Sequence, residues 1–230
     1  MRASYAVPQI IESRDLRPQH AADLAASAID FVTAALAGVC SIDHEAAYRL
    51  GLRNGDSSLS GMCFHYWEPQ SQRFSERFVR IKPDVQVEGR RYLQPVGERP
   101  RLYFVSGTSL SDLADISKAI LLTEGEKKTL ALDRAVKIKD IAAVPIGIGG
   151  VWAWRFSSKE LQPDGTMGKG KSRAIEDFDL IAWVGRKIYL FFDSDVQTNW
   201  KVAVAETALA RELIARGADV YIVRFAGGLR

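Results

Sequence analysis

The sequence predicts an α/β protein whose C-terminal part is a parallel sheet flanked by helices, with an N-terminal helical and small antiparallel β section. Short, mostly apolar runs at 119–123 (AILLT) and 187–192 (KIYLFF) are typical of strands buried on both faces. Helical patterns separate these runs, which indicates parallel βαβ crossovers. Between residues 61 and 104 the runs alternate and are broken by Pro and Gly, as in short antiparallel strands. We therefore expect an N-terminal section over 1–105 and an α/β domain over 106–230.

The N-terminal section is expected to begin with short helices. The stretch at 17–37 (RPQHAADLAASAIDFVTAALA) has apolar residues at helical spacing, and Ser41 is a candidate N-cap for a second helical run at 41–52. Composition indicates a loop at 54–61. The four alternating runs that follow predict the strands of the antiparallel section; they are GMCFHYW, RFVRIKP, RYLQPV and RLYFVSG.

In the C-terminal domain, strands and helices follow one another. After the strand at 119–123 comes a helical pattern (EKKTLALDRAVK), and then a strand that ends in a glycine turn (IAAVPIGIGG). A polar loop rich in Gly and Lys is expected at 157–173, followed by an amphipathic stretch (IEDFDLIAWVG). The strand at 187–192, a helix from about Asn199 to Arg216 and a last strand (ADVYIVR) complete the domain.

Composition excludes several classes of protein. In 230 residues, 47% are hydrophobic and 26% charged, which is ordinary for a folded chain and unlike a disordered one. Cys40 and Cys63 are the two cysteines, so a four-cysteine zinc ribbon is impossible, and Cys63, two residues before His65, is interpreted as a buried thiol. No stretch of 18 residues is uninterruptedly apolar, so we expect no membrane partner and a cytoplasmic, reduced location.

The net charge of +3 is too small to indicate a nucleic-acid partner by itself, but basic residues cluster locally. Between residues 73 and 101 there are eight Lys or Arg residues against four acidic ones, interleaved with aromatic side chains. This segment is either a surface that follows a nucleic-acid backbone, with Arg73, Arg77 and Arg80 as candidate contacts, or a β-meander with solvated arginines.

Acidic residues follow two of the predicted parallel strands. Glu124 comes directly after the strand at 119–123, and Asp193 and Asp195 follow the strand at 187–192. Ligands of open α/β sheets bind at the carboxyl ends of the strands, and residues two apart in an extended segment share a side. Clustered carboxylates suit Mg²⁺ or Mn²⁺, while Glu124 is placed to take or give a proton. Alternatively, each acid only caps the helix that follows it.

Three motifs together resemble the Toprim superfamily, which includes bacterial primases, topoisomerases and OLD-type nucleases. They are TEGEKKTLAL at 123–132, GIGGVWAW at 147–154 and LFFDSDVQTNWKVAVAETALARELIARGADVYIV at 190–223. More narrowly, the chain resembles a Toprim-like family of uncharacterised domains in phage- and plasmid-type primase and helicase proteins. The resemblance implies a Toprim-like sheet, Glu124 as general acid or base, and Asp193 and Asp195 as metal ligands. Lys127, Lys128 and Asn199 match recurring positions of the narrower family, and the resemblance implies that they are candidate contacts to phosphate or substrate.

Residues 165–172 (GTMGKGKS) satisfy the phosphate-loop pattern GxxxxGK[ST], but a polar segment with Pro163 precedes them where that motif needs a buried strand. We interpret the segment as a mobile basic loop over the acidic site, with Lys169 and Lys171 contacting substrate phosphates.

The resulting hypothesis is a Mg²⁺- or Mn²⁺-dependent enzyme of nucleic-acid metabolism, most simply the primase-type nucleotidyl-transfer part of a mobile-element replication protein. The expected partner is nucleic acid, with DNA favoured, together with a helicase or another replication protein. Two alternatives stay open: a Toprim nuclease that hydrolyses phosphodiesters, and a non-catalytic DNA-binding or helicase-docking module.

Overall fold

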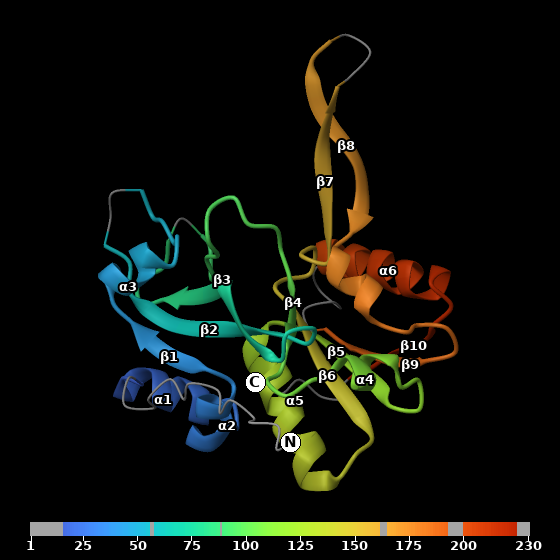
Figure 1. The fold of residues 1–230 in the computed structure, drawn as a ribbon, viewed down its shortest axis with the longest axis horizontal. Coiled ribbons are helices and arrows are strands. Elements are labelled where there is room, and N and C mark those ends of the chain that lie inside the picture. Colours follow the sequence, from blue (N-terminus) through green and yellow to red (C-terminus); the bar gives the residue numbers. More distant parts are fainter. Residues whose placement is uncertain (1–15, 56–57, 88, 162–164, 193–199, 225–230) are drawn as a thin grey trace, which may run out of the picture. The chain divides into compact units, whose positions relative to one another are not determined.

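The computed structural model describes residues 16–55, 58–87, 89–161, 165–192 and 200–224 (Figure 1). The chain forms two compact units. The first comprises Met1–Glu98 with Phe104–Thr108, and the second comprises Arg99–Tyr103 with Ser109–Arg230. None of the helices within the described ranges has the length and apolar character needed to traverse a lipid bilayer.

The first unit contains short helices and a three-stranded antiparallel sheet. Asp30 and Asp43 begin two of the helices, because their carboxylates accept hydrogen bonds from Thr33 N (2.8 Å) and Ala46 N (2.9 Å). The sheet order is β1-β2-β3. The elements are α1 (Pro18–Ala25), α2 (Phe31–Leu36), β1 (Val39–Ile42), α3 (His44–Arg49), β2 (Gly61–Glu68) and β3 (Arg73–Pro83).

Three sequence-based expectations for this unit are wrong. Ser41 does not cap a helix: it lies inside β1, and Asp43 is the N-cap of α3. The run RYLQPV forms only an isolated bridge from Leu93 to Ile81. The run RLYFVSG supplies β4 (Leu102–Phe104), which joins the sheet of the second unit. The alternating pattern correctly predicted that the last two runs are extended. It could not predict which strands they pair with, because pairing depends on contacts between residues distant in the sequence.

The second unit contains a five-stranded sheet in the order β10-β9-β5-β6-β4 (Figure 1). The pairs β10–β9, β9–β5 and β5–β6 are parallel, which confirms the predicted mixed α/β architecture with a parallel sheet and helices. Ile120, Leu122, Ile188 and Leu190 are fully buried, as the apolar runs predict. Besides β4, the elements are α4 (Leu110–Ala114), β5 (Ala119–Glu124), α5 (Glu126–Lys139), β6 (Ala143–Ile148), β9 (Lys187–Phe191), α6 (Trp200–Ala215) and β10 (Asp219–Ile222).

The expected loop at 157–173 is a β-hairpin. Strands β7 (Arg155–Leu161) and β8 (Met167–Ala174) pair antiparallel and extend away from the five-stranded sheet of this unit (Figure 1). The Gly- and Lys-rich composition indicated a loop, but cross-strand pairing offsets the weak strand propensity of these residues. The amphipathic stretch after the hairpin contains only a short 3-10 helix, η2 (Glu176–Leu180).

A capping box begins α4. Ser109 Oγ accepts a hydrogen bond from Asp112 N (3.1 Å), and the Asp112 carboxylate accepts one from Ser109 N (3.0 Å). Lys118 Nζ lies 2.6 Å from the same carboxylate. Partial burial alone would raise the pKa of Asp112, but the hydrogen bonds from Lys118 and Ser109, together with the charge of Lys118, lower it to about 2.

Asp112 is therefore expected to stabilise the fold in a pH-dependent way. Its pKa is lower in the folded state than the unfolded value of about 3.9, so its contribution is complete above about pH 4 and is lost as the pH falls toward about 2. Urea unfolding from pH 6 to pH 2.5 should show this loss in the wild type and a flatter dependence in Asp112→Asn. If the free energy of unfolding depended equally on pH in the two proteins, Asp112 would not be the group responsible for this loss of stability.

Candidate nucleic-acid site

Glu124 is the last residue of β5, at the carboxyl edge of the parallel sheet. In the sheet register it pairs with Ile148 of β6, and the preceding Thr123 pairs with both Gly147 of β6 and Phe191 of β9. Gly125 then reverses the chain at φ +94°, a conformation that residues with a side chain rarely adopt, and α5 begins at the next residue. The glycine thus fixes Glu124 between the sheet edge and the start of a helix.

The Glu124 carboxylate lies beside the ammonium group of Lys128. Lys128 Nζ is 3.1 Å from Glu124 Oε1, and the side chain of Glu124 is 12% exposed whereas that of Lys128 is 41% exposed. Lys128 lies in the first turn of α5, four positions after Glu124, so the helix holds the cation beside the strand end. Lys127 is half-buried on the same helix. The structure therefore pairs Lys128, a predicted substrate contact, with the predicted acid or base.

The other predicted residues of this site lie outside the described residues. They are Asp193, Asp195 and Asn199, in the segment 193–199 between β9 and α6. The residues at either end are described: Phe192 is buried, and Trp200, the first residue of α6, is 70% exposed.

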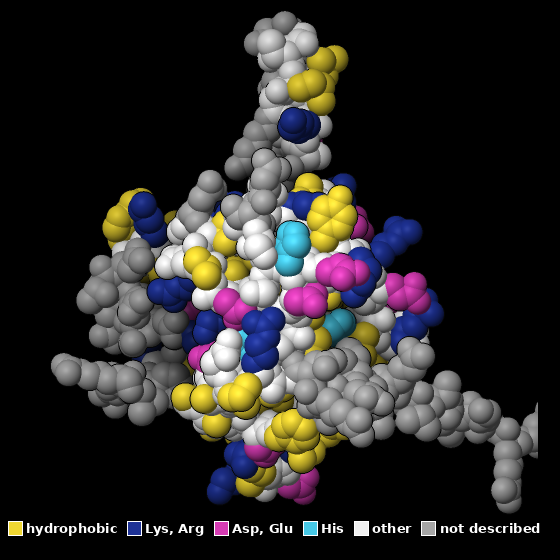
Figure 2. Space-filling model, turned by 90° about the vertical axis from the view of Figure 1, so that its left-hand side faces the viewer, with side chains coloured by type: hydrophobic (Ala, Val, Ile, Leu, Met, Phe, Trp, Pro, Cys, Tyr) yellow, Lys and Arg dark blue, Asp and Glu magenta, His cyan; other side chains and the backbone are white. Residues whose placement is uncertain are grey.

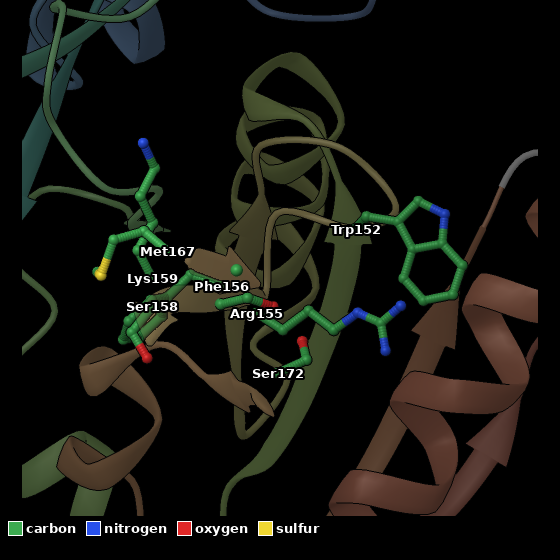
Figure 3. Close-up of a pocket in the computed structure, with 9 residues that line it drawn as sticks. Trp152, Arg155, Phe156, Ser158, Lys159, Met167 and Ser172 are labelled. Carbon is green, nitrogen blue, oxygen red and sulfur yellow. The ribbon is translucent and has the colours of Figure 1, made fainter. Parts of the chain in front are cut away.

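A groove lies along the β7–β8 hairpin, with a volume of about 630 Å³ (Figure 3). Trp152 and Arg155 line one part of it, and Phe156, Lys159 and Met167 line another. The Arg155 guanidinium lies over the Trp152 ring at 3.9 Å from its centroid and 5.3 Å from that of Trp154. The groove therefore combines aromatic rings with positive charge.

Two more arginines stack on the aromatic ring of Phe156. The guanidinium carbons of Arg99 and Arg173 lie 4.4 Å and 4.8 Å from its centroid. Stacking on an aromatic ring leaves the edge of a guanidinium group, with its N–H donors, free to meet a carboxylate or another anion. Arg99 NH1 already lies 3.0 Å from Glu176 Oε1. Trp154 is buried, whereas Trp152 is half-buried and lines the groove. The repeated aromatic and basic residues of VWAWRF were the signal for it.

The strands of the hairpin carry five basic residues and one acidic residue, Glu160; the basic ones are Arg155, Lys159, Lys169, Lys171 and Arg173. Lys159 and Lys169 occupy directly opposed positions of the two strands. The phosphate-loop pattern lies mainly in β8 and no helix follows it directly, so it is not a phosphate loop.

The basic candidates of the first unit lie on β3. Arg73 and Arg77 are exposed, and Arg73 NH1 lies 3.8 Å from Glu76 Oε1. Arg80 is half-buried, with its guanidinium 4.8 Å from the centroid of the Tyr92 ring. On the face drawn in Figure 2, Lys and Arg side chains are interspersed with Asp and Glu. This mixture resembles a solvated surface more than a single-sign patch.

A comparison with models of protein families assigns the chain to one family. The model of a family described as "Domain of unknown function (DUF3854)" matches residues 112–229, just over half of the chain. The protein belongs to this family. Among curated proteins there is no match.

The fold is similar to that of a solved primase. The structure "Crystal Structure of the Aquifex aeolicus primase (Zinc Binding and RNA Polymerase Domains)" aligns with a TM-score of 0.56 at 13% sequence identity. The alignment covers 92% of this chain and 51% of the primase chain, so the protein spans about half the length of the structure that it matches. The fold is therefore primase-like.

Proposed function

We propose that the protein is a divalent-metal-dependent enzyme that acts on nucleic-acid phosphates, with primase-type nucleotidyl transfer as its reaction. One observation carries this proposal: β5 and β9 are parallel neighbours in register, with Thr123 opposite Phe191. Glu124 follows Thr123, and the sequence Asp193-Ser-Asp195 follows Phe192. The described parts of β5 and β9 thus end at one edge of the sheet, where such folds bind ligands, and the proposal assigns all three carboxylates to this edge.

The donor chemistry fits a hard divalent cation. All three candidate side chains offer carboxylate oxygens, the ligands preferred by Mg²⁺ and Mn²⁺. We assign Asp193 and Asp195 to hold the ion, which when bound would offset the charge of phosphate oxygens. Glu124, at the strand end, would then exchange a proton with the attacking or leaving oxygen. Lys128 would hold the Glu124 carboxylate in place through their ion pair.

Two further observations favour a nucleic-acid substrate. The hairpin of the same unit carries five basic residues, and its base has arginines stacked on aromatic rings beside a groove. Basic side chains next to aromatic rings are the usual combination for binding single-stranded nucleic acid. The primase-like fold supports a Toprim-like arrangement of the sheet and a role in DNA replication.

The first test is Mg²⁺ and Mn²⁺ binding by calorimetry, with and without single-stranded DNA. Wild-type protein should bind the metal, and more tightly with DNA present, whereas Asp193→Asn/Asp195→Asn should lose binding. Glu45→Gln/Glu76→Gln is the matched control, because it removes two exposed carboxylates of the first unit and should bind metal as the wild type does. Equal binding by the aspartate variant, or none by the wild type even with DNA, would refute the catalytic assignment.

Primer-synthesis and cleavage assays on the same proteins then identify the reaction. Metal-dependent incorporation of nucleotides would support nucleotidyl transfer. Phosphodiester cleavage with the same dependence on Asp193 and Asp195 would assign the site to a nuclease instead. DNA binding that is unaffected by the aspartate variant, without turnover, would indicate a binding module.

A further inference from the structure

In the first unit, Cys40 meets two residues that are distant from it in the sequence, Cys63 and His65. Cys40 of β1 and Cys63 of β2 are directly opposed in the antiparallel register, and they form no disulfide. His65 is two residues after Cys63 in the same strand, so it lies on the same face of the sheet. The two sulfur atoms and an imidazole nitrogen all lie within 4.8 Å of one another.

The imidazole of His65 is oriented by the backbone. Its Nδ1 atom lies 2.7 Å from the carbonyl oxygen of Gly38, and the ring also hydrogen-bonds Cys40. When Nδ1–H donates to this carbonyl, Nε2 carries the lone pair. Histidines that bind metals in proteins almost always donate their other ring N–H to a carbonyl or carboxylate in this way.

The burial and the donor atoms of Cys40, Cys63 and His65 indicate which kind of metal ion could bind there. Cys63 is fully buried and Cys40 is 7% exposed, within an apolar core that includes Ala47, Val79 and Ile81. Burying a net charge in such a core is costly, but a dication bound by two thiolates and a neutral imidazole has no net charge. Sulfur and nitrogen donors without a carboxylate suit a thiophilic ion and disfavour Mg²⁺ or Ca²⁺.

Two buried thiols alone would be adequately explained as small apolar side chains. The imidazole is the observation that goes beyond this explanation, because it brings a nitrogen atom close to both sulfur atoms in addition to its edge contact with the Phe74 ring. Without a metal, the hydrogen bond with Cys40 and burial raise the pKa of Cys63, so its thiol is neutral at pH 7.

We propose that Cys40, Cys63 and His65 form a binding site for Zn²⁺, separate from the acidic site of the other unit. The ligand atoms of a tetrahedral zinc centre lie about 3.5–3.8 Å apart, so closure needs movements of about an ångström. Three protein ligands leave a fourth position for water or another small donor. The bound ion would link the four-residue strand β1 to β2. This inference does not depend on the proposed function.

The test uses the full chain, reduced and freed of metal with a chelator, and titrated with Zn²⁺ against a chromophoric competitor. About one equivalent should bind, and saturation should raise the melting temperature by about 5–10 °C, since the ion binds only the folded chain. Co²⁺ in place of Zn²⁺ should show thiolate-to-metal charge-transfer absorption, a readout that a purely structural role of the cysteines would not give.

Cys40→Ser, Cys63→Ser and His65→Gln should each weaken Zn²⁺ binding at least tenfold. His44→Gln is the control: it removes another imidazole of the unit but keeps a hydrogen-bond acceptor for Leu59 N. Should a serine variant fail to fold, protection of the wild-type thiols by Zn²⁺ against a thiol reagent gives the same information. No binding by reduced wild-type protein at low micromolar Zn²⁺, or binding by the variants equal to wild type, would overturn the proposal.

Discussion

Glu124→Gln is expected to reduce the metal-dependent activity by about 10²–10⁴-fold, the usual range for removing a general acid or base. Glutamine keeps the size and hydrogen-bonding capacity of the side chain but cannot exchange a proton at neutral pH. The fold should be unaffected, because the side chain is partly exposed and Lys128, its partner, reaches solvent. Metal binding should persist, since Asp193 and Asp195 are the assigned ligands. Single-turnover rates at saturating metal and nucleic acid measure the effect.

A matched control is available on α5, the helix that carries Lys128. Asp133 and Lys137 form an ion pair at 2.7 Å with the same spacing as Glu124 and Lys128, away from the end of β5. Asp133→Asn should therefore leave the rate within about twofold of the wild type while testing the loss of a comparable pair. If Glu124→Gln retains wild-type activity, or if both variants lose activity equally, Glu124 is not the group that moves the proton.

The parallel sheet could be predicted from the sequence because its signals are local. Runs such as 119–123 and 187–192 are too apolar to be anything but buried, and helical patterns between them require parallel crossovers. The position of Glu124 at a strand end follows directly from this reasoning. The pairing of β5 with β9, which brings Glu124 and the end of β9 to one edge, is information that the structure adds.

The features that the sequence did not predict depend on contacts across strands. The Gly and Lys residues of β8 favoured the prediction of a loop, because these residue types have weak strand propensity and form a strand here by pairing with β7. Cys40 and Cys63 are 23 positions apart, and nothing in the local pattern indicates that β1 places them opposite each other. Ser41 resembled an N-cap because Ser is a good one, but Asp43, two residues later, is the cap.

The hairpin is expected to be the main nucleic-acid contact of the protein. Lys159 and Lys171 are exposed on β7 and β8. Lys159→Gln/Lys171→Gln should weaken binding to single-stranded DNA by about 10–100-fold at low salt and reduce the slope of log affinity against log salt by about 1.4, because each lost phosphate contact removes about 0.7. Fluorescence anisotropy at several salt concentrations measures both quantities.

Arg73→Gln/Arg77→Gln provides the comparison, since it also removes two exposed positive charges, but from β3 of the first unit. Both double variants change the net charge of the protein equally, so a non-specific effect of charge would lower affinity and slope by the same amount in each. If the hairpin binds nucleic acid, only the hairpin variant should change the slope. The reverse result would place the nucleic acid on β3, and the stacked arginines at the hairpin base would then serve the fold alone.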